Sequence, residues 1–173
     1  MRLTSMSFRL ICGGILVICS CLAGFEKRSR LSVRLRGLAV IRDYFRNVKL
    51  YISHAGMSLD DIAYEIDRSV SRSQFSRIIR ENTQHSDFAS SFAAAISSLK
   101  NEWRMLPQEE ALVCSLAGKI GGMDRDGAVE LLELADEQIS SLMDSVKRKY
   151  DTDGKLYVVL GLAFGIVAAL LLI

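Results

Sequence analysis

The fold of this chain is decided by residues 124–149, which read DRDGAVELLELADEQISSLMDSVKRK. Apolar residues recur there at steps of 4, 3, 4, 3 and 4, namely Ala128, Leu132, Ala135, Ile139, Leu142 and Val146. This spacing lines them up along one side of a helix, as in the seam of a coiled coil. Asp124 is a suitable N-cap, and Gly121 and Gly122 are a stop signal for a preceding helix. The stretch predicts a long amphipathic helix, whose seam is more often core than interface.

The residues before this stretch have the same helical period. From Glu26 to Ile52, apolar residues recur every three or four positions, with arginines on the other side. His54-Ala55-Gly56 predicts the end of that helix, and Ser58 is an N-cap for the next one. Further helices are predicted at about 58–70, 73–81, 87–103 and 107–120. The chain is therefore expected to be all-α, with a helical bundle of about six helices.

Two runs without a charged residue lie at the ends, Leu10–Phe25 and Leu156–Ile173. As helices they reach roughly 24 and 27 Å, and flanking basic side chains can extend toward the headgroups of a hydrocarbon core of about 30 Å. We therefore predict N- and C-terminal transmembrane helices at 10–25 and 156–173, a short external tail at 1–9 and a helical domain at 26–155. Asp151-Thr152-Asp153-Gly154 predicts a kink or break before the second span.

The distribution of basic residues predicts the orientation of these spans. Twelve Lys and Arg residues lie close to the spans on the side of the central domain, against Arg2 and Arg9 on the other side. By the positive-inside bias, the central domain is expected to be cytoplasmic. The alternative interpretation of the first run is a signal peptide, which would give a secreted lipoprotein after cleavage near Cys21.

No catalytic, cofactor-binding or metal-binding constellation is predicted. His54 and His85 have no carboxylate or cysteine at ligand spacing, and neither a nucleophile elbow nor a phosphate loop is present. The central domain carries all 20 acidic residues and 20 of the 22 basic ones, so it is formally neutral. We therefore expect neither a nucleic acid nor a small-molecule substrate as a partner. The pairs Asp60-Asp61 and Glu109-Glu110 are interpreted as first turns of helices on solvated faces.

Two sets of residues are candidates for contacts with other molecules. In the second span, small residues at every fourth position allow close helix packing, either within the hairpin or between subunits: Gly161, Gly165 and Ala169. The arginines of the first long helix are candidates for contact with a partner or with anionic lipid: Arg34, Arg36, Arg42 and Arg46. A homo-oligomer is compatible with the first set.

The sequence Gly121-Gly122-Met123-Asp124, followed by a long helix and then by Lys155-Leu156-Tyr157, Leu160-Gly161 and Gly165, resembles the stage III sporulation protein AB family. Leu50-Tyr51 and Ser58-Leu59-Asp60 resemble the same family, as does the plan of a span at each end. The family is in turn similar to platform proteins of type II secretion and type IV pilus machines. The resemblance implies a multi-pass membrane component of the mother cell–forespore channel in an endospore-forming bacterium, with its domain on the mother-cell side.

The function expected from this resemblance is that of a non-enzymatic adaptor or platform subunit. It would couple a cytoplasmic, secretion-type ATPase to the membrane assembly and to the other channel subunits. The rival hypothesis, from a different class, is a regulatory membrane protein such as an anti-sigma anchor or a protease modulator. Capture of a transcription factor or a membrane protease, rather than the ATPase, would favour the rival.

Overall fold

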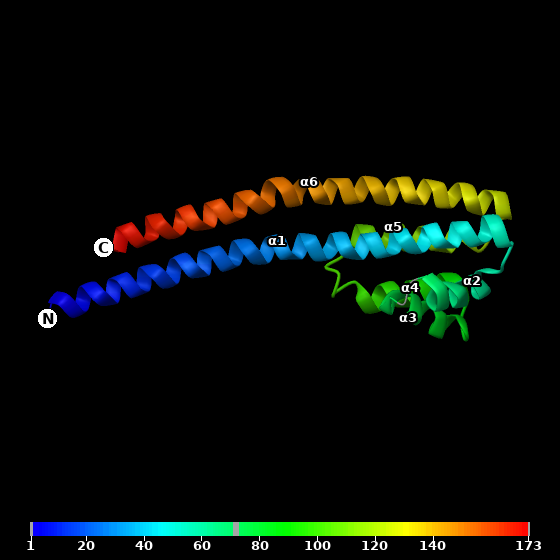
Figure 1. Cartoon of the computed structure of the whole chain (residues 1–173), viewed down its shortest axis with the longest axis horizontal. Helices are drawn as coiled ribbons and strands as arrows, with labels where there is room; N and C mark the ends of the chain where they lie inside the picture. Colours follow the sequence, from blue (N-terminus) through cyan, green and yellow to red (C-terminus); the bar gives the residue numbers. More distant parts are fainter. Residues whose placement is uncertain (1, 71–72, 173) are drawn as a thin grey trace. The chain divides into compact units, whose positions relative to one another are not determined.

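A computed structural model describes the backbone of residues 2–70 and 73–172, with few side chains described within 2–24, 69–70 and 153–172. Over this part the chain is all-helical, without a strand, which confirms the predicted fold class. Figure 1 shows the elements in sequence colours, and they are α1 Arg2–Ala55, α2 Leu59–Glu65, the π-helical turn η1 Ile66–Val70, α3 Gln74–Thr83, α4 Phe88–Leu99, α5 Pro107–Ile120 and α6 Arg125–Leu172.

Local stop and start signals set most of these boundaries. Helix α1 ends at Ala55 because Gly56 has a φ of 58°, in the left-handed region that glycine adopts without strain. The hydroxyl of Ser58 then accepts a hydrogen bond from the backbone N–H of Asp61 at 3.3 Å, as expected of the N-cap of α2. Pro107 is the first residue of α5. These three predictions are confirmed.

The chain divides into two compact units. The first consists of Met1–Ser32 and Ser145–Ile173, which are parts of α1 and α6. Within it the guanidinium of Arg28 lies 4.9 Å from the ring centroid of Tyr150, a cation–π distance. The second unit, Val33–Asp144, contains the rest of α1 and of α6 together with α2, η1, α3, α4 and α5.

No helix is both long and apolar enough to cross a membrane among the residues that could be searched. The predicted spans, 10–25 and 156–173, lie largely in the part of the chain whose side chains are not described, so the structure gives them no support. The same holds for the predicted packing residues Gly161, Gly165 and Ala169.

Of the kink or break predicted at residues 151–154, the break is wrong, since α6 continues through them, whereas the kink stays a prediction. Glycine in a helix interior costs only about 1 kcal/mol relative to alanine. Without a capping arrangement to satisfy the freed carbonyl groups, that cost alone does not end a helix.

The core of the second unit combines the predicted stripes of α1 and α6 with an aromatic cluster. Buried residues from the stripes are Leu38, Ile41, Phe45, Val48 and Ile52 on α1, and Ala128, Leu132, Ala135 and Ile139 on α6. Phe92 of α4 stacks on Phe45 at 5.1 Å and meets Phe75 of α3 edge-on at 5.3 Å. The seam of α6 is therefore core within this unit, and α3 and α4 pack against α1 through aromatic side chains.

Candidate functional site

Three connections of the second unit lie together around one groove. They are the α1–α2 connection with Gly56 and Ser58, the end of the α3–α4 connection at Asp87, and the α5–α6 connection from Gly121 to Asp124. The first and the third are short because a glycine stop signal is followed closely by an N-cap. Asp124 is the cap of α6, since its Oδ1 accepts a hydrogen bond from the N–H of Gly127 at 3.2 Å.

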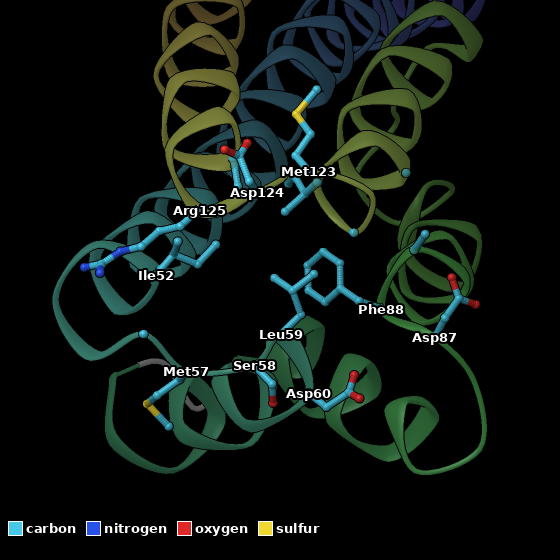
Figure 2. Close-up of a pocket in the computed structure, with 16 residues that line it drawn as sticks. Ile52, Met57, Ser58, Leu59, Asp60, Asp87, Phe88, Met123, Asp124 and Arg125 are labelled. Atoms are coloured by element: carbon cyan, nitrogen blue, oxygen red, sulfur yellow. The ribbon is translucent and has the colours of Figure 1, made fainter.

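The groove has a volume of about 590 Å³ and an apolar floor. Figure 2 shows the side chains of Leu59 and Phe88 pointing toward one another across it, with Met123 above them. Met123 is 46% exposed, which is high for so large an apolar side chain. The other apolar lining residues are Ile52, Met57, Ala89, Ile120 and Ala128. An apolar concavity of this size suits the burial of one or two side chains of a partner.

Carboxylates surround this floor. Asp60, Asp87 and Asp124 all line the groove and are exposed. A hydrogen bond with the side chain of Ser90 lowers the pKa of Asp87, so this group is ionised at neutral pH. The guanidinium of Arg125 donates to the carbonyl of Ser53, and in Figure 2 its side chain points away from Leu59 and Phe88. The groove therefore presents an apolar floor with a negative rim.

The described residues do not supply an evident reactive centre. None of their His, Cys, Asp and Glu side chains gather in threes as a metal site requires. The thiol of Cys114 on α5 is half-buried, and desolvation raises its pKa, which lowers its nucleophilicity at neutral pH. What the groove offers chemically is burial of apolar surface together with anionic hydrogen-bond acceptors.

The predicted turn and cap residues lie at this site. Gly121 and Asp124 line the groove, and Gly122 is exposed in the same connection. The sequence did not identify Leu59 and Phe88 as groove residues, because both fit the apolar periodicity of a core. A usable signal was present, since in an antiparallel bundle every second connection between helices lies at the same end of the bundle. Gly56, Asp87 and Gly121 could have been placed together on that ground.

The four candidate contact arginines of α1 are placed differently from one another. Arg42 and Arg46 both bind Asp136 of α6, each with Nε at 2.7 Å from Oδ1. Arg34 binds Glu109 of α5, and only Arg36 is exposed without an ion pair to any residue in the described part. Contact of these arginines with lipid or a partner stays a prediction, and Arg36 and Arg46 are the more exposed members of the set.

Basic side chains of α1 and acidic side chains of α6 neutralise one another inside the second unit. Besides the Asp136 pairs, Nζ of Lys49 lies 2.7 Å from Oε1 of Glu133. Hydrogen bonds from Arg42 above all, and from Arg46, hold the pKa of Asp136 well below its ordinary value. The same contact raises the pKa of Arg42. The basic first helix and the acidic last helix therefore stabilise each other.

Asp136→Asn is expected to lower the free energy of unfolding at pH 7 by about 1–2 kcal/mol, because two guanidinium groups lose a charged acceptor. Since folding depresses the pKa of Asp136, its stabilisation is present above the ordinary value of about 3.9 and is lost as the pH falls below it. Urea unfolding of both proteins should show a smaller difference at about pH 3 than at pH 7. Glu137→Gln, at an exposed neighbour, serves as the control, and a pH-independent difference for Asp136→Asn would contradict the assignment.

The chain matches a known protein family. Residues 9–173 match the family model described as stage III sporulation protein AB. No curated protein and no solved structure matches the chain. The match includes all three connections that meet at the groove, those at Gly56, Asp87 and Gly121.

Proposed function

This chain belongs to the stage III sporulation protein AB family, and we propose that it is a non-enzymatic membrane adaptor of the mother cell–forespore channel complex. In this proposal, residues 10–25 and 156–173 are membrane anchors and the central domain lies on the mother-cell side. The domain couples a cytoplasmic, secretion-type ATPase to the membrane assembly. Family membership supports the sporulation role, and the groove supports the adaptor role.

The observation that carries the adaptor proposal is the composition of the groove. Leu59, Phe88 and Met123 provide an apolar surface, and the carboxylates of Asp60, Asp87 and Asp124 surround it. Such a surface is complementary to an apolar side chain that is flanked by lysine or arginine residues. We place a segment of that kind on the ATPase. Two of the three connections that form the groove contain residues by which the sequence resembles the family, which a family-wide partner would explain.

Met123→Glu and Asp60→Lys test this proposal. Both residues are exposed, so Met123→Glu should leave the unfolding midpoint almost unaltered. Asp60→Lys places a cation in the first turn of α2 and should lower the free energy of unfolding by no more than about 1 kcal/mol. Met123→Glu places a charge where an apolar partner residue is expected, and Asp60→Lys reverses part of the rim. We expect each to reduce co-purification of the sporulation ATPase with the full-length chain by tenfold or more, and to block spore formation in the host.

The control is Leu50→Glu, which makes the same kind of change at a side chain that is 51% exposed and lies outside the groove. It should retain the ATPase and permit sporulation. Normal ATPase capture by Met123→Glu and Asp60→Lys would contradict the use of the groove. If the native chain instead captured a transcription factor or a membrane protease, the regulatory hypothesis would replace this one.

A further inference from the structure

A second concave surface of the unit Val33–Asp144 lies between α2, η1 and the start of α3, away from the groove residues. It has a volume of about 590 Å³ and is lined by Tyr64, Asp67, Arg68, Ser73, Gln74, Arg77 and Arg80. None of these residues lines the first groove. The adaptor role proposed above does not use this surface.

The charge of this surface comes from two of its three arginines. Arg80 is neutralised, since its Nη1 lies 2.7 Å from Oδ2 of the buried Asp67. Asp67 also accepts a hydrogen bond from the hydroxyl of Ser76 at 3.2 Å. Arg68 and Arg77 are exposed, and neither forms an ion pair with a carboxylate in the described part of the chain. Two uncompensated guanidinium groups therefore remain.

An aromatic side chain accompanies these two cations. Tyr64 lines the same surface and is 54% exposed. Tyrosine and arginine are, with tryptophan, the residue types enriched at the energetic centres of protein interfaces. Arg68 lies on η1, and π-helical turns are rare and occur often at functional sites. We call Tyr64, Arg68 and Arg77 the basic patch.

The chain also carries a surface of opposite character. On α6, Glu130, Leu134 and Glu137 follow at steps of four and three, which places them on one face of the helix. All three are exposed, and Leu134 is 46% exposed. Neither glutamate forms an ion pair within the described residues. We call these three residues the acidic patch.

We propose that the basic patch of one copy of this chain binds the acidic patch of a second copy. Each patch has an exposed apolar or aromatic side chain together with two like charges, and the charges of the two patches are opposite. The central domain is formally neutral, so copies do not repel one another as a whole. Because the two patches are different surfaces, the contact is head-to-tail and leaves a free patch at each end of a dimer. This inference does not depend on the identity of the ATPase.

Sedimentation velocity of the full-length chain in detergent micelles tests the proposal. The native chain should associate in a concentration-dependent way, and salt should weaken the association because exposed charges are screened. Arg68→Glu with Arg77→Glu should weaken it at least tenfold, as should Glu130→Lys with Glu137→Lys. An equimolar mixture of the two double variants should associate like the native chain, since every contact between the two is then complementary.

Arg104→Glu with Lys119→Glu is the matched control, because it makes the same change in net charge as the basic-patch variant at exposed residues outside both patches. It should associate like the native chain. Association that persists in both patch variants, as expected for contact through the membrane helices alone, would overturn the proposal. So would a native chain that stays monomeric, or a mixture that fails to restore association. Titration with inorganic phosphate is informative too: saturation of the basic patch without an effect on association would identify a small-anion site instead.

Discussion

Replacing Glu109 by alanine is expected to lower the free energy of unfolding by about 3–5 kcal/mol, the cost of leaving a buried charge without its partner. The carboxylate of Glu109 binds the Arg34 guanidinium through Nε at 3.0 and 2.9 Å and through Nη2 at 2.7 Å. The side chains are 3% and 15% exposed, respectively. Glu109 also accepts a hydrogen bond from the N–H of Leu106 at 2.9 Å, so the start of α5 would lose a cap as well.

The neighbouring residue provides the control for this prediction. Glu110 pairs with Lys100 at 2.9 Å, but these side chains are 30% and 36% exposed. Glu110→Ala should therefore cost less than about 1 kcal/mol. Urea unfolding followed by far-UV circular dichroism measures both. Equal losses from the two substitutions would show that burial of the Arg34 pair is unimportant.

A double replacement separates the cost of a lone charge from the value of the pair. Arg34→Met combined with Glu109→Leu removes both charges and keeps similar volume. It should recover most of the stability that Glu109→Ala loses, since apolar pairs often substitute for buried ion pairs without net cost. No recovery would indicate that the geometry of the ion pair itself is needed for the α1–α5 contact.

Glu109 also marks the limit of inference from the sequence. Its place in the first turn of α5 follows from Pro107 and the local charge pattern, and that prediction is confirmed. The interpretation of Glu109 as a solvated residue is wrong, because its side chain is 3% exposed and pairs with Arg34. That partner lies 75 positions away on α1, so no local pattern reveals it. Signals that act over three or four residues, such as Gly56, Ser58 and Asp124, were readable. Pairing between distant helices was not.

The core was predictable from local sequence patterns, whereas the groove was not. The seam of α6 follows from a spacing of three and four, and its members Ala128, Leu132, Ala135 and Ile139 are buried as predicted. The groove requires three connections to meet, and periodicity within each helix carries no information on that meeting. Leu59 and Phe88 satisfy the pattern of core residues whether a third connection covers them or leaves a cavity. Only the packing of whole helices decides between these outcomes.

Gly37 of α1 lies against Trp103, a contact that the apolar periodicity of the sequence does not predict. A Cβ at this position of α1 would lie 2.7 Å from Cγ of Trp103 and 2.8 Å from its Cβ and Cδ2. The Cβ of Trp103 moves with neither side-chain torsion and its Cγ does not move with χ2, so rotation of the indole alone does not relieve the overlap. The indole ring of Trp103 also packs against Phe75, with the two ring centroids 5.5 Å apart. Trp103 therefore packs directly on the backbone of α1, which only glycine permits.

Gly37→Ala is accordingly expected to destabilise the chain by about 1–3 kcal/mol through overpacking, even though alanine is the better helix former by about 1 kcal/mol. Gly118→Ala makes the same change in α5, where nothing lies within 4 Å, and should stabilise by about 0.5–1 kcal/mol. Urea unfolding followed by the fluorescence of Trp103, the one tryptophan of the chain, measures both. Shifts of the same sign would mean that Trp103 does not press on Gly37. Opposite signs would follow from the contact alone, because propensity favours alanine equally at both positions.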